Sequence, residues 1–166
     1  YEVEYRLADT SQGERWVHGR GEVIHDETGR AVRMIGLNFD VTNRRRSEEQ
    51  VRESEARFRN LADSAPALMW VSRPGGIREF VNRAYVEFAG LDYDGALTMD
   101  WRTRLFPDDL PDILKAQVQG EASRKPFSLE GRYRRADGEW RWLKSFSQPR
   151  FGPDGASGNT RILSWW

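Results

Sequence analysis

The chain has 166 residues, about the length of one domain, and it carries 26 Lys and Arg residues against 26 Asp and Glu residues. The resulting zero net charge argues against a nucleic-acid-binding protein that works through bulk electrostatic attraction. The absence of cysteine excludes disulfide bonds, thiolate catalysis and cysteine-ligated zinc. No apolar run approaches the length of a membrane span, so we expect a cytoplasmic protein without direct membrane insertion.

The first part of the chain, residues 1–42, predicts three antiparallel strands. The strand candidates are YEVEYRLAD, ERWVHGRGEVIH and AVRMIGLNFD, and the turns TSQG and DETG separate them. Both histidines of the chain, His18 and His25, lie on the middle strand. Because they are seven positions apart on one strand, they are expected to point to opposite faces, so no shared metal site is predicted.

Residues 43–60 form a predicted linker helix, because the stretch has no Gly or Pro and is rich in good helix formers. Thr42 is its predicted N-cap. Acid-first i,i+4 pairs support the helix: Glu48–Arg52, Glu53–Arg57 and Glu55–Arg59. Val51 and Phe58 lie seven positions apart, which indicates a thin heptad seam and a two-helix coiled coil. A solvated helix that only spaces two domains is the alternative interpretation.

The segment after the linker predicts two strands, a short helix and a longer helix. ALMWVS and IREFVN are the strands, and Asn82 is predicted to cap the short helix RAYVEFAG, which ends at Gly90. The longer helix begins near Asp108 or Asp109. We interpret these adjacent carboxylates as helix caps rather than as a catalytic pair, since neighbouring helix residues do not face one another. The segment also lacks a Gly-rich phosphate loop and a nucleophile elbow, so no catalytic residue is predicted in this chain.

The last part of the chain repeats the first. YRRADGEWRWLKS at 133–145 is similar to YRLADTSQGERWVHG at 5–19, and Trp142 corresponds to Trp16. Asp137-Gly138, where both residues are expected to take positive φ, joins two alternating runs into a predicted hairpin. TRILSWW is the third strand candidate. The repeat further predicts that Trp142 is packed and that Trp140 is partly exposed.

Three segments follow from the repeat. Residues 1–42 are predicted to be the C-terminal half of a first unit, 43–60 the linker, and 61–166 a second, nearly complete unit. The chain is therefore expected to be a piece of a longer protein. The order of elements in the second unit predicts an α+β fold, in which a helical crossover covers one face of a five-stranded antiparallel sheet.

Several stretches closely resemble the PAS sensory family: ESEARFRNLADSAPALMWV, VNRAYVEFAG, FPDDLPDIL and EGRYRRADGEWRWL. Asp40-Val41-Thr42 resembles the Asp-Ile-Thr signature that closes this domain, although the second copy lacks it and Phe106 replaces a frequent histidine. The resemblance implies a sensory region of a larger bacterial protein. We expect a two-component sensor histidine kinase with its kinase domain further along the same chain; a diguanylate cyclase or phosphodiesterase is the alternative.

The resemblance also implies a space between the sheet and the helices, which holds a small molecule, haem or flavin in some members. Photoactive flavin members need a cysteine on the longer helix and haem members an axial histidine there, and residues 61–166 contain neither residue type. We therefore expect no cofactor. A small-molecule sensor and a filled core that serves dimerisation both stay open. The pocket candidates are Met69, Phe80, Asn82, Ile113, Val118, Leu129, Trp142, Ile162 and Ser164.

A signal relay is predicted at the start of the linker helix. Asp40 and Thr42 lie where the last strand of the first unit passes into this helix, and Val51 and Phe58 form its weak apolar seam. A seam with nearly balanced packings can be shifted by a modest free energy. We expect a parallel homodimer with the linker helix or its surroundings at the interface.

Overall fold

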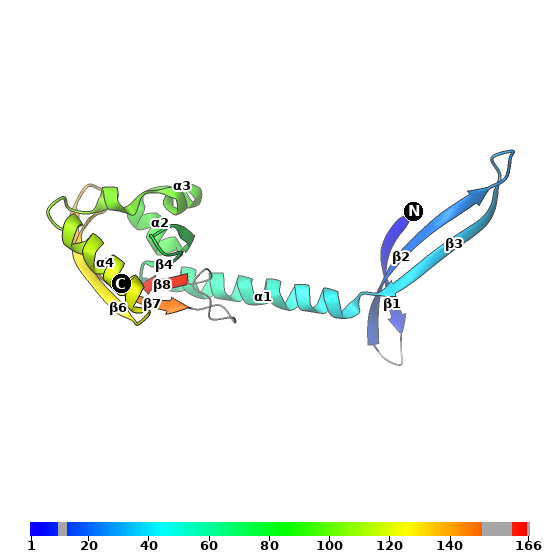
Figure 1. Ribbon diagram of the computed structural model, residues 1–166, viewed down its shortest axis with the longest axis horizontal. Coiled ribbons are helices and arrows are strands. Elements are labelled where there is room, and N and C mark those ends of the chain that lie inside the picture. Colours follow the sequence, from blue (N-terminus) through cyan, green and yellow to red (C-terminus); the bar gives the residue numbers. More distant parts are fainter. Residues whose placement is uncertain (10–12, 151–160, 166) are drawn as a thin grey trace. The chain divides into compact units, whose positions relative to one another are not determined.

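The structure, a computed structural model, describes residues 1–9, 13–150 and 161–165. It forms two compact units, Tyr1–Arg57 and Phe58–Trp166. The first contains a three-stranded sheet, and the second contains a five-stranded sheet with helices (Figure 1). The predicted α+β class with antiparallel sheets is confirmed.

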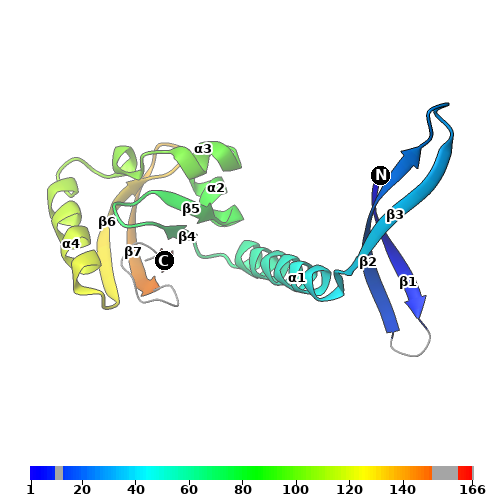
Figure 2. The same cartoon turned by 45° about the vertical axis from the view of Figure 1, so that its right-hand side comes forward.

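In the first unit, β1 (Glu2–Asp9), β2 (Gly13–His25) and β3 (Ala31–Asp40) pair in the order β1-β2-β3. β2 and β3 form the long hairpin visible in Figure 2, and its turn is held by Asp26, which accepts hydrogen bonds from Thr28 and Arg30. Apolar side chains along β3 are more than half exposed: Val32, Met34, Ile35, Leu37 and Phe39. Within the described residues, this sheet therefore buries little of its apolar surface.

The helix α1 (Thr42–Ser64) follows β3 closely, as its composition predicts. Thr42 is not its N-cap, because its hydroxyl is used elsewhere: it accepts the backbone N–H of Trp16 on β2 at 2.9 Å. The Asp40 carboxylate instead accepts the backbone N–H of Thr42 at 2.9 Å. The prediction of a Thr42 cap is thus wrong, and Asp40 satisfies the first N–H of the helix.

None of the helices in the described parts of the chain has the length and apolar character needed to cross a membrane.

The second unit has five strands, which pair antiparallel in the order β5-β4-β8-β7-β6. They are β4 (Met69–Ser72), β5 (Arg78–Val81), β6 (Phe127–Arg134), β7 (Trp140–Arg150) and β8 (Arg161–Trp165). Between β5 and β6 the chain forms α2 (Arg83–Ala89), α3 (Tyr93–Thr98), the 3-10 helix η1 (Trp101–Arg104) and α4 (Leu110–Ser123). Figures 1 and 2 show these helices gathered on one side of the sheet.

The residues that precede the helices differ in whether their side chains form cap hydrogen bonds. Asn82 caps α2 by accepting the N–H of Tyr85, and Gly90 ends that helix in the left-handed conformation; both predictions are confirmed. Asp109 precedes α4 but makes no cap hydrogen bond. Its carboxylate instead binds Arg132 on β6, with Arg132 Nη2 at 2.6 Å and Nε at 3.0 Å. The prediction that Asp109 caps α4 through its side chain is therefore wrong. Both of its carboxylate oxygens are bound by the Arg132 guanidinium, so Asp109 links the start of α4 to the sheet.

The β6–β7 hairpin turns as predicted, but with a different backbone conformation. Gly138 alone has positive φ, at 88°, and Asp137 does not. The N–H of Gly138 donates to the carbonyl of Arg135, and the N–H of Arg135 donates to Glu139. A three-residue loop with one left-handed glycine explains this pattern, so the expectation of two positive-φ residues is wrong.

Asp137 is expected to make the stability of this hairpin depend on pH in the acid range. Hydrogen bonds from the Arg135 guanidinium and the Glu139 backbone lower the pKa of Asp137 to about 2, below the ordinary value of about 3.9. The stabilisation is therefore complete above about pH 4 and is lost as the pH falls through about 2. A carboxyl-carbon NMR titration of Asp137 measures this pKa. Arg135→Gln should raise it towards the ordinary value, and an unchanged titration would contradict the role of Arg135.

The core of the second unit consists of two clusters between the helices and the sheet. Val81, Tyr85 and Ala96 form one cluster. Trp101, Leu105 and Ile113 form the other and pack against the sheet at Leu129 and Tyr133, among others. Glycine allows the close approach beneath Ile113, since a Cβ on Gly131 would lie 2.3 Å from Ile113 Cδ1.

Candidate functional site

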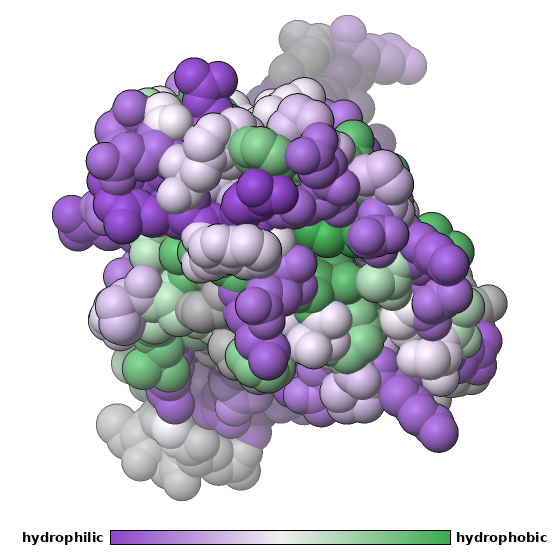
Figure 3. Space-filling model, turned by 90° about the vertical axis from the view of Figure 1, so that its left-hand side faces the viewer, coloured by the Kyte–Doolittle hydropathy of each residue, from purple (hydrophilic) through white to green (hydrophobic). Residues whose placement is uncertain are grey.

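A cavity lies between the sheet of the second unit and its helices. The centre of a water-sized sphere can occupy a volume of about 50 Å³ within it. This volume is enough for more than one water molecule. Residues from β4, β5, β6 and β7 line it on the sheet side, and residues from α2, η1 and α4 line it on the helix side. In the face of the molecule that Figure 3 presents, apolar side chains gather in a central hollow with hydrophilic side chains around it.

The sheet side of the cavity combines hydroxyl groups with a stacked cation. Ser72, Ser145 and Ser147 line it, and each is at most 5% exposed. The Arg78 guanidinium lies over the rings of Trp70 and Tyr85, 4.8 Å and 5.0 Å from their centroids. Arg78 Nε donates to the Tyr85 hydroxyl at 3.0 Å. These contacts hold the guanidinium in one orientation at the cavity wall.

The helix side carries two polar atoms that have no hydrogen-bond partner among the described residues: Trp101 Nε1 and Gln117 Oε1. Trp101 is 6% exposed. The Gln117 amide nitrogen donates to Glu121 Oε1 at 2.8 Å, which leaves the amide oxygen as the free acceptor. A Cβ on Gly76 would lie 2.6 Å from Trp101 Nε1 and 3.4 Å from Gln117 Nε2, so both side chains meet above this glycine.

The charged side chains around the cavity are mostly cationic. Arg78, Arg104 and Arg134 line it together with a single acid, Glu121. None of these arginines forms an ion pair with a residue that the structure describes. Glu121 is already engaged, because its Oε2 accepts the N–H of Gly75 at 3.0 Å and its Oε1 binds Gln117. The charged side chains that line the cavity therefore carry a net positive charge.

Of the predicted pocket residues, Leu129 lines this cavity and Ile113 lies in the core beside it. Met69 and Phe80 do not line it; the Phe80 ring packs on Phe58 at 5.2 Å between ring centroids. Asn82 is fully buried and uses both ends of its amide for backbone groups, so its prediction as a ligand contact is corrected. The side chains of Ile162 and Ser164 lie outside the described residues.

Trp142 and Val118 were predicted to be pocket residues, and this prediction is wrong. Trp142 is 67% exposed, more than Trp140 at 41%, and Val118 is 66% exposed. On β7, Ser145 and Ser147 face the helices, so residues of the opposite parity, including both tryptophans, lie on the outer face of the sheet. Trp140 packs edge-on against Phe106 there, whereas Trp142 lies beside the Arg132 guanidinium. The predicted order of burial of the two tryptophans is therefore reversed.

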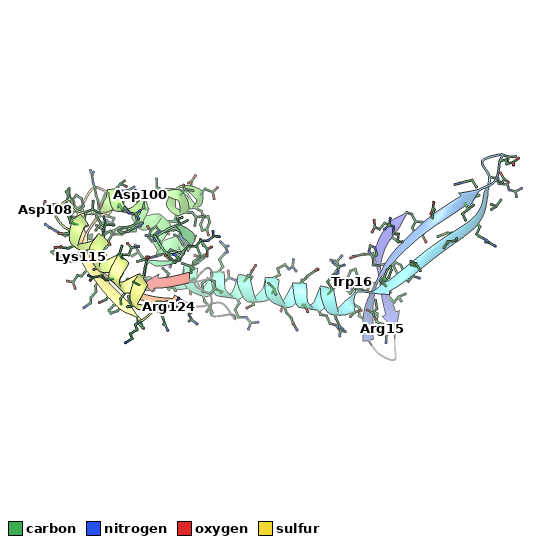
Figure 4. The ribbon with its side chains drawn as sticks, viewed as in Figure 1. Arg15, Trp16, Asp100, Asp108, Lys115 and Arg124 are labelled. Atoms are coloured by element: carbon green, nitrogen blue, oxygen red, sulfur yellow. The ribbon has the colours of Figure 1, made fainter. Side chains whose placement is uncertain are left out.

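The predicted relay residues Asp40 and Thr42 form a hydrogen-bonded joint in the first unit. Hydrogen bonds from the Thr42 hydroxyl and N–H lower the pKa of Asp40. The N–H of Val41 donates to the Trp16 carbonyl at 2.9 Å, and the N–H of Trp16 donates to the Thr42 hydroxyl. Trp16 on β2 therefore binds both residues that connect β3 to the first turn of α1. Figure 4 shows Arg15 and Trp16 beside the beginning of α1.

A second contact at the joint was missed at the sequence level. Glu4 on β1 accepts hydrogen bonds from Arg44 Nη2 at 2.6 Å and from Arg45 Nε at 2.9 Å. Hydrogen bonds from Arg45 and Arg44 lower the pKa of Glu4, and the Arg45 guanidinium also lies 5.1 Å from the Trp16 ring centroid. The sequence signal for this contact was the run of arginines at 44–46, which is more typical of a solvated helix start.

The seam residues of α1 are exposed. Val51 is 57% exposed and Phe58 is 44% exposed, although Phe58 also contacts Phe80.

Among the described residues, no group of three or more His, Asp or Glu side chains could hold a metal ion.

The sequence of the chain matches one known family. The sequence model of the PAS fold matches residues 1–38 and 78–160, which is more than half of the chain. The chain belongs to the PAS fold family. The matched residues 78–160 include most of the described strands and helices of the second unit.

The curated relatives of this chain are much longer than the chain itself. The uncharacterized protein y4lL of Sinorhizobium fredii is 34% identical over 154 residues, which cover 93% of this chain and 19% of the relative. The two-component sensor PprA of Pseudomonas aeruginosa is 32% identical over 143 residues, which cover 83% of this chain and 15% of the relative. The chain therefore spans less than a fifth of either relative.

The fold is shared with solved PAS domains. The crystal structure of the PAS domain of an HTR-like protein from Haloarcula marismortui superimposes with a TM-score of 0.58. The two are 21% identical, and the match covers 73% of this chain and 96% of the other.

Proposed function

We propose that this chain is the sensory PAS region of a larger signalling protein. In this proposal the second unit binds a small molecule, and α1 relays a change of state between the sheet of the first unit and the second unit. One observation carries the relay: β3 enters α1 through a joint in which Asp40 and Thr42 are hydrogen-bonded to each other and Thr42 to β2. In this proposal a small shift of these strands moves the start of α1 through these hydrogen bonds.

We further propose that residues 1–42 are the C-terminal half of another PAS unit. The order β1-β2-β3 in the first unit has the same neighbours as β6-β7-β8 in the second. The match to the PAS fold includes residues 1–38 as well as 78–160. Both observations support a tandem arrangement, which also explains why the apolar side chains of β3 are exposed.

The larger protein is proposed to be a cytoplasmic two-component histidine kinase, because PprA is a two-component sensor and is similar over most of this chain. Its catalytic domain would lie outside these residues, and this chain would not itself be an enzyme. A diguanylate cyclase or phosphodiesterase is the second candidate for the output.

A small-molecule sensor is favoured over a filled core by the cavity itself. Two buried polar atoms at its wall, Trp101 Nε1 and Gln117 Oε1, have no partner among the described residues, which would be unfavourable in a core that only serves packing. Haem and photoactive flavin stay outside the proposal, because the chain has no cysteine and its two histidines lie in the first unit.

The relay requires a partner for the exposed seam of α1, and we propose a parallel homodimer. Val51→Cys and Phe58→Cys are expected to form disulfide-linked dimers, since bridged Cα atoms approach within about 7 Å. The natural chain has no cysteine, so any disulfide-linked dimer must form through the introduced residue. Glu53→Cys is the matched control, because it lies about 200° around the helix from Val51.

Sedimentation of the uncrosslinked protein gives the oligomeric state independently of the disulfides. A sedimenting dimer in which position 53 crosslinks as well as position 51 would reject a paired seam. It would leave α1 as a plain spacer.

A further inference from the structure

We propose that the cavity of the second unit binds a small hydroxycarboxylate: an anion of a few carbon atoms that carries one carboxylate and a nearby hydroxyl. This inference rests on the proposed sensory function and assigns the chemical class of the ligand. It follows from three features of the cavity wall: its charge, its unpartnered polar atoms and its size.

The charge of the wall selects an anion. Three arginines line the cavity with one glutamate, and among them Arg78 is half-buried; both carboxylate oxygens of Glu121 already accept hydrogen bonds. Tyr133 adds no negative charge, because burial raises the pKa of its hydroxyl. The cationic wall is therefore not neutralised by the described residues around it, and an anionic ligand would complete it.

Arg78 is the arginine best placed to hold a carboxylate. Its guanidinium is oriented by the Trp70 and Tyr85 rings, and Nε is used by the Tyr85 hydroxyl. The two terminal nitrogens make no hydrogen bond with a described residue. A guanidinium binds a carboxylate through two parallel N–H donors, and a preoriented one loses less conformational entropy on binding.

The hydroxyl is selected by the pair of unpartnered atoms on the opposite wall. Trp101 Nε1 is a donor and Gln117 Oε1 is an acceptor, and both side chains meet above Gly76. A hydroxyl group both accepts and donates a hydrogen bond, so one such group satisfies both atoms. A carboxylate could not donate to the amide oxygen, and an ammonium could not accept from the indole N–H.

The size of the cavity limits the ligand to a few heavy atoms, as the space for water-sized spheres is about 50 Å³. An ordered water could satisfy Trp101 and Gln117 as well, but it would leave the arginines without a counter-charge. Charge and hydroxyl therefore have to be tested separately.

Isothermal titration calorimetry of the whole chain with glycolate, lactate and 3-hydroxybutyrate tests the class. We expect at least one of them to bind with one site per chain. Two analogues of lactate separate its groups: lactamide keeps the hydroxyl without the charge, and propionate keeps the charge without the hydroxyl. Each is expected to bind at least about tenfold more weakly than lactate.

Variants then assign the contacts. Trp101→Phe keeps a packed ring but removes the N–H, and Gln117→Met removes the acceptor at a position that is only half-buried. Both are expected to weaken binding of the hydroxycarboxylate about tenfold and to leave propionate unchanged. Trp142→Phe, on the outer face, is the control and should bind as the parent does.

Equal binding of lactamide would overturn the role of the arginines, and equal binding of propionate would overturn the role of Trp101 and Gln117. Failure of all three hydroxycarboxylates, with a cavity that holds only water, would overturn the inference as a whole. Crosslinking of Val51→Cys does not depend on the cavity. If it succeeds while no hydroxycarboxylate binds, the ligand class fails and the paired α1 seam stands.

Discussion

Replacing Asn82 by Ala is expected to destabilise the second unit by about 3 kcal/mol or more, because four backbone groups each lose a hydrogen bond. The side chain is fully buried and lies at the centre of these groups. Its Oδ1 accepts the N–H of Met69 at 2.9 Å and of Tyr85 at 3.1 Å. Its Nδ2 donates to the carbonyls of Ala62 and Ala67, each at 2.8 Å. Urea unfolding followed by circular dichroism measures the loss.

Two further variants show whether the network or the cap causes the effect. Asp92 caps α3 at an exposed position, so Asp92→Ala loses a cap alone and should cost about 1 kcal/mol. Asn82→Asp keeps both accepting contacts but loses both donated ones, and it adds a charge to a buried site. It should therefore be destabilising even though Asp is a good N-cap. If Asn82→Ala cost no more than Asp92→Ala, the buried network would contribute little.

Replacing Ile113 by Ala is expected to cost about 2–5 kcal/mol, the range for a large buried aliphatic residue. Ile113 is 4% exposed and packs in the cluster with Trp101 and Leu105. Its Cδ1 lies where a side chain on Gly131 would begin, so the sheet cannot readily collapse into the space left behind. Chemical denaturation again gives the free energy of unfolding.

Val118 is the matched control for Ile113, because both are β-branched residues of α4. Val118 is 66% exposed, so Val118→Ala should change the free energy of unfolding by no more than about 0.5 kcal/mol. Similar losses for both variants would contradict the described orientation of α4 against the sheet.

Most of the secondary structure was predictable from local signals. Helix α2 begins after Asn82 and ends at Gly90, as these residue types predict, because a cap depends on groups within one helical turn. The Asp137-Gly138 hairpin was predicted for the same reason, although its turn conformation was not. Thr42 shows where this reasoning fails: it has the right residue type for a cap, but Trp16, distant in the sequence, takes its hydroxyl.

The candidate site was much less predictable. The alternation in β7 indicated that Trp140 and Trp142 share a face, but it did not indicate which face meets the helices. The large size of the tryptophans favoured the buried face, whereas the small serines further along the same strand, Ser145 and Ser147, line the cavity. Arg78, Trp101 and Gln117 come from three separate elements, and no local pattern relates them.

The sequence by itself determined the order of strands and helices, the resemblance between the two ends of the chain and the membership of the PAS family. These properties depend on residue periodicity and on turn and cap residues close together in the chain. Only the tertiary structure decided which face of the sheet the helices cover and which arginines line the cavity. It also decided that the buried Asn82 side chain forms hydrogen bonds with four backbone groups. Those outcomes depend on contacts between residues far apart in the sequence, where packing of whole elements overrides the preference of any single side chain.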